Sequence, residues 1–178
     1  MNGLFRKLRP TYMTGCAFSL TPEVLSGLGI RAVILDIDGT LVPQDAPADE
    51  AAVTYIRQLK DAGIRCFILS NNGEERVKAF ADCLGTDYLF KVRKPSPDGY
   101  REAMKRMGSS RQDTLVIGDQ LFTDVWGAGR AGLRSVFITQ PFDPSRETRA
   151  VKLKRRPEKL LLAFMREHIP VIGGKKQL

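Results

Sequence analysis

Two aspartates follow an apolar run near the start of the chain, in the stretch AVILDIDGTLV at residues 32–42. Asp36 ends the run, and Asp38 comes two positions later, just before Gly39. A carboxylate at the edge of a core costs free energy unless it is paired, hydrogen-bonded or bound to a metal ion. Either the fold tolerates the cost of two carboxylates at this place, or a chemical function requires them.

Other polar residues of the kind that phosphate chemistry uses follow later apolar runs of the chain. Ser70 and Asp119 each end such a run, Asp124 comes shortly after Asp119, and Lys94 lies between the third predicted strand and the helix that follows it. Several carboxylates in one place repel one another, and a divalent cation relieves that repulsion. Mg²⁺ prefers oxygen ligands and is commonly held by one or two carboxylates together with a substrate phosphate. One Mg²⁺ and one lysine would carry charge suited to a phosphate dianion.

Strand-like and helix-like segments alternate along the middle of the chain. The predicted strands are 32–37, 64–70, 88–92, 113–119 and 134–139, and the predicted helices are 49–63, 71–85, 96–108 and 122–132. This alternation predicts an α/β fold, a Rossmann-like three-layer sandwich with a parallel central sheet. Ligands of such sheets bind outside the carboxyl ends of the strands, which is where all the polar residues above would gather.

Four motifs in this order carry a resemblance to a known family: DIDGTLV, LSNN, RKPSPDGY and IGDQLFTD. They resemble the four successive motifs of the haloacid dehalogenase (HAD) superfamily across residues 31–140. The SNN and GDQLFTDV segments and the arginine-rich KLKRRPEKLLL narrow the resemblance to capless subclass IIIA phosphatases of the YqeG type. That group is related to phosphatidylglycerophosphate phosphatases. The lead-in before residue 31 departs more from the family pattern.

The resemblance implies a role for each motif residue. Asp36 would be the nucleophile that forms an aspartyl-phosphate, and Asp38 would be the general acid and base. The phosphate would be bound by Ser70, Asn71 and Lys94. The cofactor would be Mg²⁺, held by Asp36, the backbone carbonyl of Asp38, Asp119 and Asp124.

The spacing of the motifs leaves no room for an inserted cap domain. There are 31 residues between Asp38 and Ser70, and 23 between Ser70 and Lys94. A capless site is open and favours a bulky or membrane-borne phosphorylated substrate. The resemblance points to a phospholipid phosphate such as phosphatidylglycerophosphate, and a soluble sugar or nucleotide phosphate is the alternative substrate.

Basic charge is concentrated at the two ends of the chain. Residues 1–30 hold three Lys or Arg against one acid, residues 31–140 hold 15 of each, and residues 141–178 hold ten against four. We therefore expect a lead-in segment (1–30), a HAD-like catalytic core (31–140) and a basic C-terminal extension (141–178). Within the extension, we expect irregular chain as far as residue 156 and a terminal helix over 157–168.

Six cations lie between residues 149 and 159, followed by the apolar LLLAFM. This pattern predicts contact with anionic lipid at a membrane surface. The competing interpretation is that Leu160, Leu161 and Phe164 pack the helix on the sheet. A basic run also attracts nucleic acid, so a nucleic-acid- or ribosome-associated binding protein is the alternative to an enzyme.

Several function classes are excluded or disfavoured by composition. No apolar run reaches the roughly 18 residues that a membrane helix needs. The start of the chain lacks the long apolar segment of a secretory signal. Three scattered cysteines argue against a disulfide framework, and the single histidine, His168, rules out a multi-histidine metal site within the chain. We expect a cytoplasmic protein that can be peripheral on the inner membrane face, as a monomer or a homo-oligomer.

Overall fold

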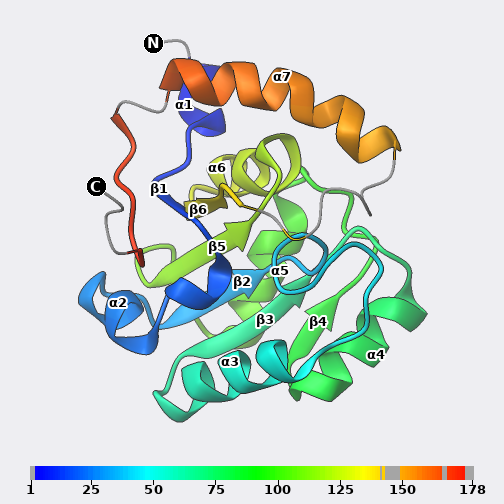
Figure 1. Cartoon of the computed structure of the whole chain (residues 1–178). Helices are drawn as coiled ribbons and strands as arrows, with labels where there is room; N and C mark the ends of the chain where they lie inside the picture. The colour runs from blue at the N-terminus through cyan, green and yellow to red at the C-terminus, as the bar shows by residue number, and fades with distance from the viewer. Residues whose placement is uncertain (1–2, 141, 143–148, 166–167, 175–178) are drawn as a thin grey trace.

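The computed structural model describes residues 3–140, 142, 149–165 and 168–174 of the chain. Within them, six parallel strands form one sheet in the order β1-β6-β5-β2-β3-β4 (Figure 1). The strands are β1 (Tyr12–Thr14), β2 (Ala32–Leu35), β3 (Arg65–Leu69), β4 (Asp87–Leu89), β5 (Thr114–Gly118) and β6 (Arg134–Ile138). The predicted parallel α/β sandwich is confirmed.

Helices cover both faces of the sheet. They are α1 (Gly3–Leu8), η1 (Ala17–Ser19), α2 (Pro22–Gly27), α3 (Glu50–Asp61), α4 (Glu74–Leu84), α5 (Asp98–Met107), η2 (Leu121–Val125), α6 (Trp126–Ala131) and α7 (Arg149–Met165). Helices α2, α3 and α4 pack on one face, and α5 and α6 pack on the other. None of the helices in the described part of the chain is long and apolar enough to cross a membrane.

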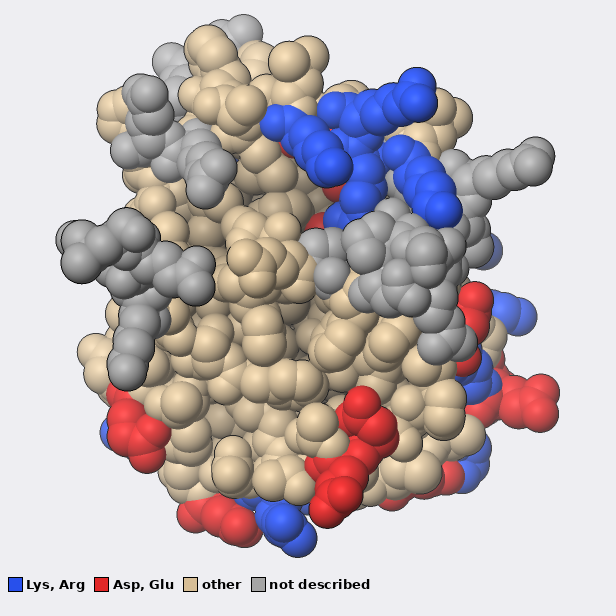
Figure 2. Space-filling view, viewed as in Figure 1, with Lys and Arg blue, Asp and Glu red and all other residues tan. Residues whose placement is uncertain are grey.

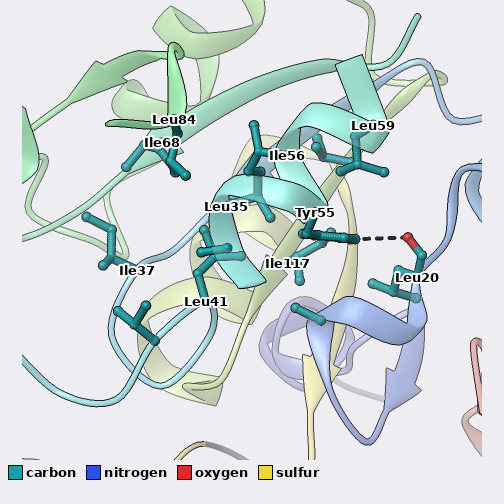
Figure 3. Close-up of a cluster of buried hydrophobic side chains, with 14 of the residues drawn as sticks. Leu20, Leu35, Ile37, Leu41, Tyr55, Ile56, Leu59, Ile68, Leu84 and Ile117 are labelled. Atoms are coloured by element: carbon teal, nitrogen blue, oxygen red, sulfur yellow. Dashed lines mark hydrogen bonds between the residues drawn. The ribbon is translucent and has the colours of Figure 1, made fainter. Parts of the chain in front are cut away.

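The central strand β2 is buried on both faces, which explains its unbroken apolar sequence. Leu35 belongs to the cluster beneath α3, and its neighbour Ile34 belongs to the opposite cluster beneath α5. Figure 3 shows Ile56 and Leu59 of α3 in the first cluster. The hydroxyl of Tyr55 donates to the carbonyl of Leu20 at 3.1 Å, which satisfies the one polar atom that this side chain brings into the core.

Strand β1 is the one strand that the sequence did not predict. It pairs with β6 in register Met13 to Phe137, and its other edge meets the C-terminal segment. There the N–H of Met13 donates to Pro170 at 2.9 Å, and the N–H of Ile172 donates back to Met13 at 2.9 Å. Three residues are too few to show an alternating pattern, so the pairing rests on partners far along the chain.

The predicted start of the C-terminal helix was wrong. Helix α7 begins at Arg149 and contains Pro157, where the sequence suggested that a helix would begin. The helix continues past the proline, and Leu161, Leu162 and Met165 beyond it pack in the third apolar cluster. The packing interpretation was right for Leu161, which is partly buried, and wrong for Leu160 and Phe164, which are 77% and 85% exposed.

Candidate active site

The turn after β2 places Asp36 and Asp38 at the carboxyl edge of the sheet. The N–H of Asp36 donates to the carbonyl of Ile117 at 3.1 Å, which continues the ladder between β2 and β5 past the end of the strand. Gly39 follows with φ of +79°, a left-handed conformation that favours glycine. A Cβ atom at Gly39 would also lie 2.3 Å from Oδ2 of Asp119, so both the conformation and the space require glycine.

Lys94 lies between two carboxylates. Its ammonium donates to Oδ1 of Asp36 at 2.6 Å and to Oδ1 of Asp124 at 2.8 Å, and its side chain is 3% exposed. Asn71 braces the backbone of Lys94 from the end of β3: its Oδ1 accepts from the Lys94 N–H at 2.7 Å, and its Nδ2 donates to the Lys94 carbonyl at 3.5 Å. The lysine is therefore held at both its backbone and its charged end.

Asp119 and Asp124 follow β5, the neighbour of β2 in the sheet. Together with Asp36 they form a group in which one oxygen from each carboxylate lies within 4.8 Å of the others. A side chain at Gly118 would lie 2.5 Å from the Cβ of Asp124, so only glycine lets the turn bring Asp124 into this group. The geometry supports the sequence argument that these carboxylates share one place.

A divalent cation fits this group. Oδ1 of Asp119 is buried and has no hydrogen-bond partner among the described residues. A buried carboxylate oxygen without a partner is costly, and a cation would remove that cost. The donor set is made of oxygen atoms alone, with no histidine or cysteine, which is the set that Mg²⁺ prefers.

The pKa values of the group reflect crowding of like charge. Burial raises the pKa of Asp36 from 3.8 to about 7, against the opposing effect of Lys94. Burial and the two neighbouring carboxylates raise the pKa of Asp119 well above its ordinary value. Burial disfavours the ammonium of Lys94, but Asp124 and Asp36 outweigh it and raise the lysine pKa. Lys94 therefore stays positively charged, and the neighbouring carboxylates carry more negative charge than this lysine neutralises.

Asp38 is separate from this group and is held by its own donors. Its carboxylate accepts from Arg76 Nη2 at 2.5 Å, Asn72 Nδ2 at 2.5 Å and the backbone N–H of Asp45 at 2.8 Å. Arg76 also donates to the carbonyl of Ala46 at 3.1 Å. Arg76 and Asn72 were not predicted as site residues. Asn72 stands inside the second motif, but nothing in the sequence pattern marks Arg76, which lies on α4.

A hollow of about 170 Å³ opens beside these residues, lined by Asp36, Asp38, Gln44, Ser70, Asn71, Asn72, Lys94, Gln120 and Thr123. Ser70 is 2% exposed, and its hydroxyl accepts from the N–H of Asn72 at 3.2 Å. Binding pockets for whole small molecules are usually about 300–1,000 Å³. The hollow therefore has room for a phosphate-sized group and little more. The phosphate-binding roles of Ser70, Asn71 and Lys94 stay predictions.

The C-terminal helix contributes two charged residues that were not predicted. Arg155 donates to the side chain of Asp119 at 2.5 Å and to its carbonyl at 3.0 Å. Glu158, at 2% exposure, accepts from the N–H of Phe122 at 3.0 Å. The segment KLKRRPEKLLL supported the family resemblance and predicted a basic surface, but its charge pattern did not indicate that Arg155 reaches the carboxylate group.

Comparison with known proteins identifies the family that the sequence motifs resemble. The family model of haloacid dehalogenase-like hydrolases matches residues 42–132. The "Probable phosphatase YqeG" of Bacillus subtilis is 38% identical over 122 residues, which cover 68% of this chain and 71% of that protein. "Phosphatidylglycerophosphate phosphatase 1, chloroplastic/mitochondrial" of Arabidopsis thaliana is 26% identical over 151 residues, which cover 79% of this chain but 43% of that protein.

Among solved structures, a cobalt-bound deoxy-D-mannose-octulosonate 8-phosphate phosphatase from Haemophilus influenzae superimposes with a TM-score of 0.53. The match covers 77% of this chain and 90% of that one at 19% identity, so it supports the fold alone. The family model and the Bacillus relative carry the assignment further. The chain belongs to the haloacid dehalogenase-like hydrolases and is an enzyme of their phosphatase branch.

Proposed function

We propose that this protein is a Mg²⁺-dependent phosphatase that hydrolyses a phosphate monoester through an aspartyl-phosphate on Asp36. The observation that carries the proposal is the arrangement around Lys94, whose ammonium pairs with Asp36 and Asp124. Beside them lies a carboxylate oxygen of Asp119 that has no hydrogen-bond partner in the described part of the chain. This arrangement offers one position for a cation and one for a phosphate. Asp38 lines the same hollow as Asp36 and Lys94.

In the first step, a carboxylate oxygen of Asp36 attacks phosphorus, and the bond from phosphorus to the ester oxygen breaks. Asp38 gives its proton to the departing oxygen, which leaves as an alcohol. Lys94 holds Oδ1 of Asp36 and stabilises the negative charge on the transferring phosphoryl group. When bound, Mg²⁺ would be held by Asp36, Asp119 and Asp124 and would supply Lewis-acid stabilisation of the phosphoryl oxygens.

In the second step, Asp38 takes a proton from a water molecule whose oxygen attacks phosphorus. The bond between phosphorus and the Asp36 carboxylate breaks, and inorganic phosphate leaves. Arg76 and Asn72 hold the Asp38 carboxylate in one orientation through both steps. Because the hollow is small, the remainder of the substrate stays outside it.

A phospholipid monophosphate, such as phosphatidylglycerophosphate, is the substrate that we propose. The chain resembles a phosphatase of that lipid from Arabidopsis over 151 residues. Between Asp38 and Lys94 the chain folds as α3, β3, α4 and β4, all within the sandwich, so no inserted domain covers the hollow. An open site of this kind can accept a phosphate that is presented at a surface.

The outer face of α7 supports contact with an anionic bilayer. Leu153, Leu160 and Phe164 are 68%, 77% and 85% exposed, and their spacing of seven and four residues puts them on one side of the helix. Arg156 and Lys159 are exposed beside this stripe. Figure 2 shows blue Lys and Arg side chains gathered over one end of α7. A cationic flank beside an apolar stripe suits the surface of an anionic membrane.

A phosphatase screen tests the proposed activity. The wild type is expected to hydrolyse phosphatidylglycerophosphate in vesicles with Mg²⁺ and to lose that activity in EDTA. Asp119→Ala is expected to raise the Mg²⁺ requirement sharply, whereas Asp61→Ala, which removes an exposed carboxylate on α3, is the matched control. Equal activity with and without added metal would contradict the cation site. Faster hydrolysis of sugar or nucleotide phosphates than of the lipid would favour the alternative substrates.

Vesicle sedimentation tests the membrane surface. The double variant Leu160→Asp and Phe164→Asp is expected to bind anionic vesicles more weakly than the wild type, because it places charge on the apolar stripe. Arg57→Glu changes an exposed arginine on α3, at the end of the molecule away from α7 in Figure 1, and is expected to bind normally. If the double variant loses RNA binding in gel shifts but still binds vesicles as the wild type does, the result would favour a nucleic-acid partner instead.

A further inference from the structure

The inner face of α7 reaches the carboxylate group of the site. The guanidinium of Arg155 makes two bonds to the same residue: Nη2 to Oδ2 of Asp119 at 2.5 Å and Nη1 to the Asp119 carbonyl at 3.0 Å. The side chain of Arg155 is 13% exposed and that of Asp119 is 1% exposed. A planar guanidinium that grips both the backbone and the side chain of one residue fixes the orientation of that side chain.

The helix that carries Arg155 is anchored on the loop that carries the carboxylates. Glu158 lies three residues further along α7, is buried, and accepts from the N–H of Phe122 in η2 at 3.0 Å. Met165 and Ile169 pack with Leu121 in the third apolar cluster. Arg155 therefore approaches Asp119 from a docked helix rather than from a loose tail.

The two oxygens of Asp119 have different surroundings. Oδ2 bonds to Arg155 and faces the backbone at Gly39, where an added Cβ would lie 2.3 Å away. Oδ1 has no partner among the described residues. Arg155 thus occupies one oxygen and leaves the other for a cation. Mg²⁺ needs near-ideal octahedral geometry, whereas Ca²⁺ takes six to eight oxygens and readily binds both oxygens of a carboxylate.

We propose that Arg155 is a positioning residue that makes Asp119 a one-oxygen ligand, so that α7 sets the preference of the site for Mg²⁺ over Ca²⁺. The inference rests on the proposed cation site and adds a determinant of its selectivity. Removal of the guanidinium frees Oδ2, and Asp119 can then offer both oxygens to a larger ion. The loss of one positive charge strengthens the attraction for both divalent ions alike, so the ratio of the two affinities isolates the geometric effect.

Isothermal titration of the full-length protein with MgCl₂ and with CaCl₂ tests this, because it reads binding without activity. Arg155→Met keeps an unbranched aliphatic side chain but loses the donors. The ratio of Mg²⁺ to Ca²⁺ affinity is expected to fall by about tenfold, at the lower end of the usual effect of partners that orient metal ligands. Arg155→Lys, which keeps a donor for Oδ2, is expected to restore the wild-type ratio. Arg156→Met, the exposed neighbour, is the matched control and is expected to leave it unchanged.

Thermal unfolding establishes that each variant is folded at the temperature of titration, and Arg155→Ala replaces Arg155→Met if the latter is not folded. A folded Arg155 variant with the wild-type ratio would overturn the inference. So would an equal shift of the ratio in Arg156→Met, since that would show that the ratio does not depend on the contact between Arg155 and Asp119. If the wild type itself binds no Mg²⁺, the proposed function falls. If the wild type binds Mg²⁺ and the ratio does not respond to Arg155, only the selectivity inference falls.

Discussion

Asp36→Asn is expected to abolish activity while stabilising the metal-free protein. The change keeps the shape of the side chain and an oxygen that can still accept from Lys94, which now donates to Asp36 at 2.6 Å. It removes the nucleophile, because an amide oxygen does not form the aspartyl-phosphate. It also removes one charge from a group of three closely spaced carboxylates whose negative charge exceeds the positive charge of the lysine and arginine paired with them. Function and stability therefore oppose each other at this residue.

The magnitude follows from the pKa of Asp36, which burial raises from 3.8 to about 7. A carboxyl group whose pKa is higher in the folded state than in the unfolded state binds its proton more tightly when the protein is folded. The group therefore stabilises the fold fully at a pH below its unfolded-state pKa. This stabilisation is lost as the pH rises through its folded-state pKa. A shift of about three pH units corresponds to about 4 kcal/mol at most. Asparagine does not titrate, so the variant does not lose this stability.

Urea unfolding in EDTA, followed by tryptophan fluorescence, measures the effect. Between pH 5 and pH 8 the stability difference between variant and wild type is expected to widen by about 2.5 kcal/mol in favour of the variant. With a typical urea dependence of about 1–3 kcal/mol per molar, the gap in midpoints widens by about 1 M. Asp61→Asn, an exposed carboxylate on α3, is the control and should track the wild type.

Two results would refute the reasoning about Asp36. A midpoint that follows the wild type at both pH values would show that the buried charge carries no cost in the metal-free fold. Near-normal phosphatase activity with an unchanged unfolding curve would show that Asp36 is not the nucleophile. Beryllofluoride, which mimics an aspartyl-phosphate, gives an independent check, since it should bind the wild type only with Mg²⁺ and should not bind the variant.

Three further changes have distinct expected outcomes. Lys94→Met removes the ammonium that pairs with both Asp36 and Asp124. The metal-free protein should therefore lose about 3 kcal/mol of stability in urea unfolding, and Mg²⁺ should restore part of it. Deletion of residues 149–178 removes buried parts of α7 and the segment on the edge of β1, so folding stability and all activity should fall together. Full activity of that truncation on a soluble phosphate ester would contradict this. Burial raises the pKa of Cys66 to about 12, so iodoacetamide at pH 8 should modify exposed Cys83 and leave Cys66 unmodified until the chain is denatured, as peptide mass spectrometry would show.

The motif residues could be predicted because sheet geometry is a general rule. Asp36 and Asp119 each follow an apolar strand, and neighbouring parallel strands bring their carboxyl ends together whatever the helices do. The arginines could not be predicted in this way. Arg76 reaches Asp38 across 38 positions, and Arg155 reaches Asp119 across 36. These contacts depend on where each helix docks and on which of its sides faces inward. The spacing of apolar residues in the sequence did not predict either property for α4 or α7.

Helix α7 also changes how the basic run should be understood. As sequence, the run is a sum of charges, but a helix turns by about 100° per residue and separates neighbours. Arg155 points to Asp119, whereas Arg156 is exposed, and Glu158 is buried although it lies among cations. Some of the charge that the composition would place on the surface, that of Arg155 and Glu158, therefore lies inside the molecule at the site. The salt dependence of binding to an anionic surface should reflect only the outward cations of α7. The inner face of the helix acts on the carboxylate group instead, through the contact of Arg155 with Asp119.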